Sequence, residues 1–334
     1  MKLKENFLVI GSNSFSGSHF VNYLLSKGHK TIGVSRSKEM REIFLPYKKN
    51  INYKLFSFYK IDLNNDKDVK KLLKIINKFK IKYVVNFAAQ GMVAQSWLYP
   101  LDWYRTNILG LINFTNQILN NKKIKKFVQV STPEVYGNIE GSTKESSNYN
   151  PSTPYAISKA CYDFHLMALF KSFKFPVVFT RAANVFGPGQ GLYRIIPKSI
   201  IMAIQKKKIP LHGGGSSLRS FVYIEDIADA TYKICLKSNI GEIYHISTNR
   251  LISIKNLVKL IFNQNNLDYK KYIIRTKERT GKDKAYKLNS KKLRKKLNWK
   301  PKTTLEKGIM ETQKWVKDNF NLIRKLPLNY EHKK

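Results

Sequence analysis

Cysteine and long apolar runs are both scarce in this chain. Only Cys161 and Cys235 occur in 334 residues, which excludes the disulfide framework of a small secreted domain and favours two buried thiols in a reducing compartment. No segment approaches the roughly 20 apolar residues that span a bilayer. The first apolar run, residues 7–10, is too short for the hydrophobic region of a secretory signal, and a glycine follows it. We therefore expect a cytoplasmic protein without a membrane partner.

Acidic residues are also few. The chain has 22 Asp and Glu against 61 Lys and Arg, a formal net charge of +39. A chain this basic can bind nucleic acid or an anionic membrane surface. However, the lysines are scattered, and the one dense basic stretch, residues 291–296, is typical of the solvated face of a short helix. We interpret the charge as a lysine-rich composition and expect no nucleic-acid partner.

Metal-ligand spacing is missing among the histidines. Five of the six stand apart from one another and from the cysteines: His19, His29, His165, His245 and His332. Structural and catalytic metal sites bring several His, Cys or acidic ligands together at short, regular spacings. We therefore predict no metal site.

Strand-like and helix-like segments alternate through the first half of the chain. The predicted strands are residues 7–10, 31–35, 83–87, 127–131 and 177–181, and the predicted helices are 17–27, 66–79, 103–119 and 155–173. Because the strands are almost continuously apolar, the alternation predicts a Rossmann-type α/β fold, with a doubly wound parallel sheet covered on both faces.

The pattern loosens after about residue 184, where glycine and proline cluster. We interpret this half as a smaller C-terminal substrate-binding lobe, from which the strand-like segments 221–224 and 243–246 are expected to return to the main sheet. The predicted dinucleotide-binding domain comprises residues 1–183 with about 220–247. The predicted substrate lobe comprises residues 184–219 and 248–334.

A Gly/Ser turn joins the first predicted strand to the first predicted helix. Glycines in such a turn allow a backbone to approach a pyrophosphate, and the helix N-terminus supplies unpaired N–H groups. The spacing matches a G-x-x-G-x-x-G motif, except that serine replaces the middle glycine. The candidate cofactor-binding residues here are Gly11, Asn13, Ser14, Phe15, Ser16 and Gly17.

The second predicted strand ends in Ser35, Arg36 and Ser37. An acidic residue at this place would bind the adenosine ribose and favour NAD, whereas arginine flanked by hydroxyls suits a 2′-phosphate. This favours NADP, with NAD as the alternative, although a solvated loop arginine would give the same sequence. Asp62 and Leu63 follow the third strand, where an aspartate commonly reaches the adenine amino group.

Tyr155 and Lys159 form the strongest local signal. Their i, i+4 spacing places both side chains on one face of a helix. A lysine ammonium near a phenol favours the phenolate, so that the tyrosine can act as a base near neutral pH. Thr132, 23 residues earlier, ends a predicted buried strand. The three residues indicate oxidation at a carbinol carbon by a nicotinamide cofactor.

These features resemble the extended short-chain dehydrogenase/reductase family, and within it the nucleotide-sugar 4,6-dehydratases of the dTDP-glucose, GDP-mannose and GDP-N-acetylglucosamine kind. The resemblance covers nearly the whole chain. Its residues are 86–90, Ser96, Pro100, 107–110, 130–137, Pro154, Tyr155, Lys159, 181–189 and 219–226. It implies further cofactor contacts from Phe87, Ala88, Ala89, Gln90, Asn107, Val130 and Ser131, and a tightly bound cofactor that each turnover regenerates.

The resemblance also implies a mechanism. Tyr155 would remove the proton of the sugar C4 hydroxyl while hydride passes to the nicotinamide, and Thr132 would bind the C4 oxygen. Glu134 would then take the C5 proton, water would leave from C6, and hydride would return to C6. Glu134 separates the dehydratases from C4 epimerases, which usually carry a small residue there, but sugar-acid decarboxylases can also carry a glutamate.

One position departs from the dTDP-glucose enzymes, which have an Asp-Glu pair. Here the first member of the pair is Pro133, which cannot protonate the leaving hydroxyl. Glu134 itself or an ordered water would supply that proton. The departure makes dTDP-glucose a less favoured substrate, so we expect a GDP-sugar, including GDP-N-acetylglucosamine.

The resemblance assigns the remaining substrate contacts as well. Arg194 and Arg219 would face the substrate diphosphate, which suits a guanidinium fork. Lys282 is a further cationic candidate, and Gln90 and Asn184 are sugar-side contacts. His212 would lie beside the base, although a loop histidine without a ligand is an equally good interpretation.

Two alternatives stay open at this point. Helices 103–119 and 155–173 pair into a homodimer interface in the family, but they could instead be buried within one chain. The chain could also be a cofactor-binding regulatory or nucleic-acid-binding protein that uses a dehydrogenase fold. The intact set of Thr132, Tyr155 and Lys159 argues against this second alternative.

Overall fold

A parallel sheet of seven strands forms the centre of the larger lobe. The computed structural model describes residues 4–138, 141–277 and 287–332. The strand order is β12-β7-β5-β4-β1-β2-β3, and all neighbouring strands are parallel. The strands are β1 (Asn6–Ile10), β2 (Lys30–Ser35), β3 (Phe56–Lys60), β4 (Tyr83–Asn86), β5 (Lys126–Ser131), β7 (Val177–Ala182) and β12 (Ile243–Ile246).

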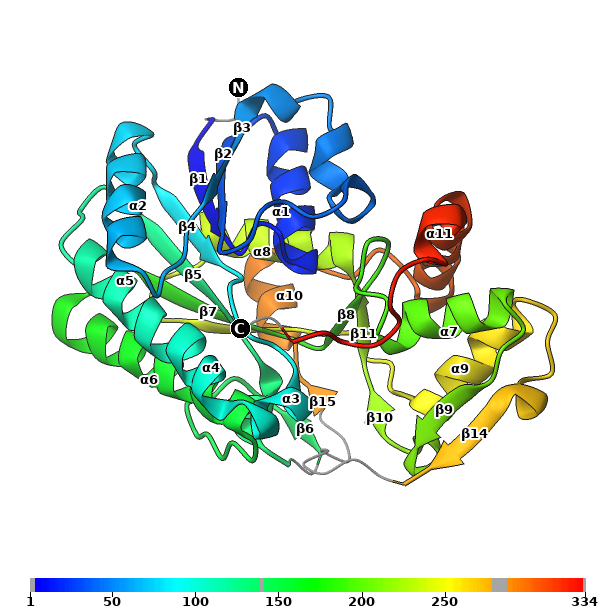
Figure 1. Ribbon diagram of the computed structural model, residues 1–334. Helices are drawn as coiled ribbons and strands as arrows, with labels where there is room; N and C mark the ends of the chain where they lie inside the picture. Colours follow the sequence, from blue (N-terminus) through cyan, green and yellow to red (C-terminus); the bar gives the residue numbers. More distant parts are fainter. Residues whose placement is uncertain (1–3, 139–140, 278–286, 333–334) are drawn as a thin grey trace.

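Helices cover both faces of this sheet (Figure 1). They are α1 (Phe15–Ser26), α2 (Asp66–Lys78), α3 (Val93–Leu98), α4 (Pro100–Tyr104), α5 (Gly110–Ile118), α6 (Pro154–Phe173), α8 (Ile224–Lys237) and α10 (Lys291–Leu297). Alternate residues of β1 belong to different cores. Phe7 and Val9 pack in one cluster with α1 and α8, whereas Leu8 and Ile10 pack in the other with α2, α5 and α6. This two-sided burial is why the strand is apolar at every position from Phe7 to Ile10.

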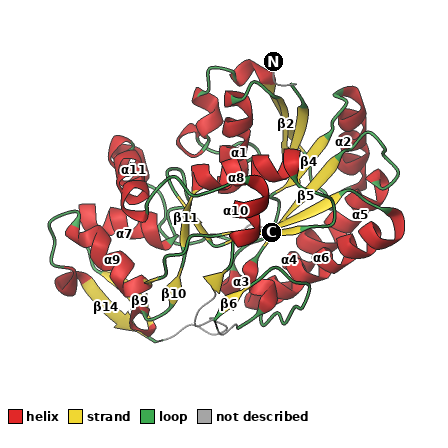
Figure 2. Cartoon of the chain, turned by 180° about the vertical axis from the view of Figure 1, so that it is seen from behind, coloured by secondary structure: helices red, strands yellow, loops and turns green. Residues whose placement is uncertain are grey.

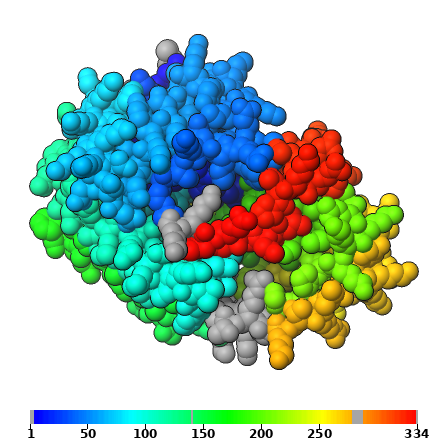
Figure 3. Space-filling model, in the orientation of Figure 1, coloured from blue at the N-terminus to red at the C-terminus, as the bar shows by residue number. Residues whose placement is uncertain are grey.

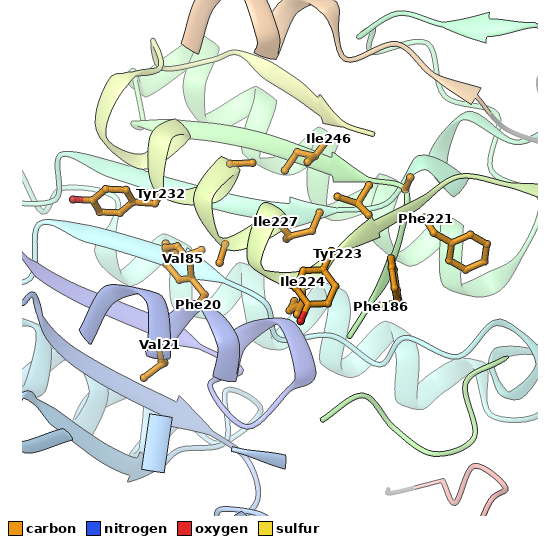
Figure 4. Close-up of a cluster of buried hydrophobic side chains, with 14 of the residues drawn as sticks. Phe20, Val21, Val85, Phe186, Phe221, Tyr223, Ile224, Ile227, Tyr232 and Ile246 are labelled. Carbon is orange, nitrogen blue, oxygen red and sulfur yellow. The ribbon is translucent and has the colours of Figure 1, made fainter. Parts of the chain in front are cut away.

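Figure 4 shows part of the cluster on the α1 and α8 face. Phe20 and Val21 of α1, Val85 of β4 and Ile227 of α8 are all nearly inaccessible to solvent. The same cluster continues to Phe186 and Phe221 of the smaller lobe. The two lobes therefore share one apolar core, and their relative position is held by packing.

The smaller lobe lies beside the carboxyl ends of these strands (Figures 1 and 2). Parallel pairs are formed by β8 with β11, β9 with β14 and β6 with β15, and β10 pairs antiparallel with β13. Its strands are β8 (Asn184–Phe186), β9 (Ile209–His212), β10 (Leu218–Arg219), β11 (Phe221–Tyr223), β13 (Ile252–Ser253) and β14 (Ile273–Thr276), with β6 (Ser142–Thr143) and β15 (Lys287–Leu288). Its helices are α7 (Ile195–Ile204), α9 (Ile254–Asn263), α11 (Leu305–Asp318) and α12 (Phe320–Ile323).

The predicted fold class is confirmed, and one predicted strand pairing is wrong. β12 joins the main sheet beside β7, as expected, but β11 pairs with β8 instead. The Ala183 backbone N–H still donates to β12, at Ile246, whereas the Asn184 N–H donates to Ser220. The chain thus leaves the sheet after β7, and β12 takes the edge that β11 would have needed. The domain boundaries at residues 183 and 247 stay a prediction.

The predicted helix 103–119 is continuous but not uniform. It consists of α4, a π-helical segment over Arg105–Leu109, and α5. Such π-helical turns are rare and occur often at functional sites. None of the described helices is long and apolar enough to cross a bilayer.

Candidate active site

The turn between β1 and α1 brings the backbone close to where a ligand would lie. Gly11 has a φ of +80°, and a Cβ there would lie 2.7 Å from the Ala88 backbone nitrogen. A Cβ on Gly17 would lie 2.2 Å from the Gly11 carbonyl oxygen. Ser14 is the N-cap of α1, where its Oγ accepts a hydrogen bond from the Gly17 N–H at 3.0 Å. Serine in place of the middle glycine therefore keeps the turn and caps the helix.

Polar atoms in this turn fit a dinucleotide. Ser12 Oγ and Asn13 Oδ1 are buried and have no hydrogen-bond partner among the described residues. Buried polar atoms left in this way are costly unless a bound group satisfies them. The first turn of α1, which begins with Phe15 and Ser16, contains no acidic residue. The positive end of the helix dipole is thus available to a phosphate.

Asn13 also ties the turn to the loop after β2. Its backbone N–H donates to Ser35 Oγ at 3.0 Å, and its Nδ2 donates to the Ser37 carbonyl oxygen at 3.0 Å. Arg36, which is half-buried, lies between these two anchored residues. The predicted 2′-phosphate residue is therefore held beside the predicted pyrophosphate turn.

The other predicted cofactor residues lie where neighbouring strands end. The amide of Asn86 at the end of β4 orders the next loop, because its Oδ1 accepts from the Ala88 N–H at 3.1 Å and its Nδ2 donates to Gln129 Oε1 at 2.8 Å. The carboxyl ends of parallel strands are where such folds bind ligands. The residues concerned are Asp62 and Leu63 after β3, Phe87, Ala88 and Ala89 after β4, and Val130 and Ser131 at the end of β5.

Asn107 in the π-helical segment connects this loop to the catalytic helix. Its Oδ1 accepts from the Gln90 N–H at 2.8 Å, and its Nδ2 donates to the Gln90 carbonyl at 3.0 Å and to Ser158 Oγ at 2.9 Å. Ser158 Oγ in turn donates to the Tyr155 carbonyl at 2.7 Å. The amide oxygen accepts one of these bonds and the amide nitrogen donates two. Asn107 therefore positions both the loop after β4 and helix α6. The sequence assigned it a direct cofactor contact, and that contact stays a prediction.

Tyr155 and Lys159 begin α6, as the i, i+4 spacing predicts. Thr153 caps the helix with its Oγ1, which accepts from the Ala156 N–H at 3.2 Å. The Tyr155 N–H is bound by Ser96 Oγ at 3.2 Å. Lys159 is 2% exposed, and its Nζ donates to the Val130 carbonyl at 2.8 Å. Burial lowers the pKa of Lys159 to about 8, so the ammonium is still mostly charged at neutral pH.

Thr132 and Glu134 are held by a short helical turn directly after β5. This turn, η5 (Pro133–Tyr136), begins with Pro133 at a position where no N–H donor is needed. Thr132 caps it, since its Oγ1 accepts from the Glu134 N–H at 3.3 Å. Glu134 is half-buried. The proline that departs from the Asp-Glu pattern thus shapes the turn that places Glu134 beside the end of β5.

A buried ion pair supports this strand end, and sequence reasoning missed it. Arg181 Nη2 lies 3.3 Å from Asp163 Oδ2, and both side chains are 0% exposed. Ser131 Oγ donates to the same carboxylate oxygen at 2.6 Å. The Arg181 guanidinium stacks over the rings of Tyr136 and Tyr149 at 4.7 and 4.6 Å from their centroids. The only sequence feature that points to this pair is the position of Asp163, four residues after Lys159.

The predicted substrate residues lie mainly in the smaller lobe. Arg194 is exposed at the start of α7, with its guanidinium 5.4 Å from the centroid of the Tyr193 ring. Asn184 begins β8, and Arg219 is half-buried in β10. These side chains come from three different segments of one lobe. Tyr155, by contrast, begins α6 of the larger lobe.

Two further substrate candidates are His212 and Lys282, and the structure describes only the first of them. His212 at the end of β9 lies 3.0 Å, at Nδ1, from Thr276 Oγ1 and 3.2 Å from the Lys277 carbonyl oxygen. These contacts support the interpretation of a loop histidine that orders β9 against β14. Lys282 lies outside the described residues.

The geometry agrees with comparisons to known proteins. A family model described as GDP-mannose 4,6 dehydratase matches residues 8–312. A dTDP-D-glucose 4,6-dehydratase from Dictyostelium discoideum is 33% identical over 369 residues, covering 95% of this chain and 82% of the relative. This chain belongs to the nucleotide-sugar 4,6-dehydratase family. The predicted resemblance and the predicted enzymatic, lyase-type character are confirmed.

Solved structures agree with the fold of this dehydratase-family chain. A dTDP-glucose 4,6-dehydratase from Streptomyces venezuelae, solved with NAD, has a TM-score of 0.86 at 26% identity and covers 95% of this chain and 98% of its own. A UDP-glucose 4-epimerase from Thermotoga maritima has a TM-score of 0.85 at 27% identity and covers 94% and 99%. Since the two scores are nearly equal, the backbone does not separate dehydratase from epimerase.

Proposed function

We propose that this chain converts a nucleoside-diphosphate hexose to its 4-keto-6-deoxy product. The observation that carries the proposal is the position of Glu134 next to Thr132, on the turn that ends β5. The same strand end binds Lys159 through the Val130 carbonyl. A base for the C5 proton and the residues for C4 oxidation therefore come from adjacent backbone, as an oxidation followed by an elimination requires.

Tyr155 is the proposed base of the first step. It takes the proton of the C4 hydroxyl as that carbon is oxidised, and the charged Lys159 favours its phenolate form. Thr132 Oγ1 binds the C4 oxygen and orients it. A bound nicotinamide dinucleotide supplies the hydride acceptor and donor.

Glu134 is the proposed base of the elimination. The 4-keto group acidifies the C5 proton, which Glu134 accepts. The C6 hydroxyl must gain a proton to leave as water, and Glu134 has just acquired one. Because Pro133 has no acidic group, one carboxyl carries the proton from C5 to the leaving oxygen, and the step balances without a second acid.

The residues favour NADP as the cofactor, whereas the Streptomyces venezuelae structure holds NAD. Support for NADP comes from Arg36 between two hydroxyl residues at the end of β2. We propose NADP as the preferred cofactor and NAD as a functional substitute. Reconstituting the apoprotein with each dinucleotide and comparing the two dissociation constants tests this preference directly.

The substrate base is proposed from two lines of support that differ. The sequence favours a GDP-sugar, including GDP-N-acetylglucosamine, on the basis of Pro133 and short motifs. The relative at 33% identity, which is similar over 95% of this chain, is named a dTDP-D-glucose enzyme. We give dTDP-glucose precedence because that similarity extends over the whole chain, and we keep a GDP-hexose as the second candidate.

Exposed apolar side chains support the proposed homodimer. They lie on the helices named for this role and include Leu101 of α4, Leu109 of the π-helical segment, and Ile157 and Phe164 of α6. We propose that these side chains form one apolar patch, which would be typical of a protein–protein interface. Sedimentation of the wild type beside a Leu109→Glu, Phe164→Glu variant tests it. The cytoplasmic location stays a prediction.

Product analysis tests the reaction itself. The protein is incubated with dTDP-glucose, UDP-glucose, GDP-mannose and GDP-N-acetylglucosamine, and products are followed by mass spectrometry and NMR. Loss of one water with a new C6 methyl group is expected for one of them. Inversion at C4 without loss of water would make the chain an epimerase. A nucleotide-linked sugar acid is included as a further candidate, and release of carbon dioxide from it would make the chain a decarboxylase.

Two substitutions separate the steps in deuterated water. Tyr155→Phe should prevent C4 oxidation, so that neither product nor deuterium at C5 is formed. Glu134→Gln should leave substrate binding unchanged but stop both deuterium exchange at C5 and loss of water. Normal elimination in Glu134→Gln would remove Glu134 from its proposed role.

A further inference from the structure

The C-terminal segment crosses from the smaller lobe back to the larger one. We call residues 324–332 the strap. It leaves α12 with Leu326 and Leu328 packed against the apolar core shared by the lobes. In Figure 1 it runs from the α11 region toward α3 and α4, where the chain ends, and in Figure 3 it lies across the front of the molecule. A segment in this position covers the junction between the cofactor lobe and the substrate lobe.

The far end of the strap is held in an aromatic slot. The His332 ring stacks between Tyr99, at 4.6 Å and 9°, and Trp103, at 5.2 Å and 20°. Its Nε2 lies 2.7 Å from Asp102 Oδ2. Two stacked rings and a charge-assisted bond hold one imidazole whose side chain is only 10% exposed. These contacts make a specific attachment of the strap to the larger lobe.

The middle of the strap lies among cations of both lobes. The Tyr330 ring packs edge-on against Tyr193 at 5.2 Å, and the Arg194 guanidinium lies 5.4 Å from the centroid of the same Tyr193 ring. Burial raises the pKa of the Tyr330 phenol, against the opposing effects of Arg194 and Arg36. Arg194 belongs to α7 of the smaller lobe, and Arg36 follows β2 of the larger lobe. One step along, Asn329 Oδ1 accepts from Lys198 Nζ at 3.3 Å. Three cationic side chains thus gather around the strap at the lobe junction.

Three cationic side chains close together favour the binding of an anionic ligand. Arg36 is the residue proposed for the cofactor phosphate and Arg194 the residue proposed for the substrate diphosphate, and the charges of both act on the Tyr330 phenol. A phenol hydroxyl can donate to a phosphate oxygen while its ring packs against the neighbouring tyrosine. The strap therefore lies between a residue proposed for the cofactor phosphate and a residue proposed for the substrate diphosphate.

We propose that the strap is a closing element of the ligand site, in which Tyr330 binds the phosphates of the nucleotide ligands and His332 in its slot keeps the strap closed. The proposal rests on the proposed function for the identity of the two ligands. Ligands can exchange only when His332 leaves the slot. The cofactor is regenerated in every turnover, so a closed strap retains it between catalytic cycles.

Cofactor release measures the closure directly. Protein loaded with NADP or NAD is mixed with excess competing nucleotide, and the release rate is followed by fluorescence. His332→Ala should release the cofactor roughly tenfold faster, since loss of about 1.4 kcal/mol of closing energy is tenfold. Tyr330→Phe should show a smaller acceleration, because it keeps the ring and loses the hydroxyl. Glu331→Gln, an exposed neighbour within the strap, is the matched control and should match the wild type.

Hydrogen exchange of residues 324–332 gives a second readout that needs no turnover. Adding cofactor together with dTDP, UDP or GDP should slow exchange across the strap in the wild type and in Glu331→Gln, but not in His332→Ala. The proposed closure by the strap would be refuted by an unchanged rate of cofactor release in His332→Ala. It would also be refuted by equal hydrogen exchange with and without nucleotides, even if dehydratase activity is found. Conversely, if His332→Ala releases cofactor faster but the wild type dehydrates no sugar, the proposed reaction is refuted and the proposed closure by the strap still holds.

Discussion

Asp163→Asn is the substitution for which the structure predicts the most specific result. Asp163 and Arg181 are both 0% exposed, and their nearest charged atoms are 3.3 Å apart. Replacing the carboxylate with an amide keeps the shape and the bond from Ser131, but it leaves a guanidinium buried without its counter-charge. Breaking a buried pair in this way typically costs about 3–5 kcal/mol.

The same substitution should move the pH dependence of catalysis. Lys159 must be charged to hold the Tyr155 phenolate, and its pKa of about 8 is raised by Asp163 and lowered by burial. Activity should therefore be retained below about pH 8 and fall above it in the wild type. A carboxylate within a helical turn contributes about 1 pKa unit or more. In Asp163→Asn the fall should begin about one unit lower, near neutral pH.

Urea unfolding and a pH profile of kcat together test this reasoning. Glu306→Gln is the matched control, because it removes a carboxylate from an exposed pair with Arg250, at 2.6 Å, and should cost under about 1 kcal/mol. If Asp163→Asn also lowers the unfolding free energy by under about 1 kcal/mol, Asp163 is protonated in the native protein. Burial does raise the pKa of Asp163, against the opposing effects of Arg181, Ser131 and Lys159. An unshifted pH profile would show that Asp163 does not act on Lys159.

Three other substitutions test the cofactor site and its supports. Arg36→Asp should weaken NADP binding by roughly tenfold or more and leave NAD binding equal or improved, as measured by equilibrium titration. Gly11→Ala should abolish binding of either dinucleotide, because the new Cβ would lie 2.7 Å from the Ala88 nitrogen at a φ of +80°; normal binding would mean that the turn can move. Asn107→Leu should remove two hydrogen bonds to the Gln90 backbone, lower the unfolding free energy by about 1–3 kcal/mol in urea titrations and reduce kcat more than it raises KM. A change confined to KM would indicate direct ligand contact by Asn107.

Much of the site could be predicted because its residues act through local structure. Tyr155 and Lys159 share a helix face through spacing alone, and the helix begins at the proline beside Tyr155. Thr132 ends an apolar strand, and the glycine turn is recognisable from its residues and its place after the first strand. Each of these signals is contained within a few consecutive residues.

Other parts could not be predicted, because they join residues with no local pattern. Asn107 is expected to contact the cofactor, but no local pattern indicates that its amide also binds a loop and a helix. His212 is expected either beside the base or as a loop histidine, and no local pattern indicates its contact with β14. The pairing of β11 with β8 depends on where the chain leaves the sheet after β7. Residues of the same type and spacing can either contact a ligand or support the fold, and only their neighbours in space decide between these two roles.

The amino-acid sequence by itself determined the alternating fold and the glycine turn after the first strand, since periodicity and short-range spacing dictate these. Its resemblance to a known family implied the roles of Thr132, Glu134, Tyr155 and Lys159. Only the tertiary structure decided the buried pair of Asp163 with Arg181 and the strap that ends in the His332 slot. His332 meets Asp102 across 230 positions of the chain. No local preference specifies such a contact, because its energy comes from stacking, burial and charge that exist only after both lobes have packed.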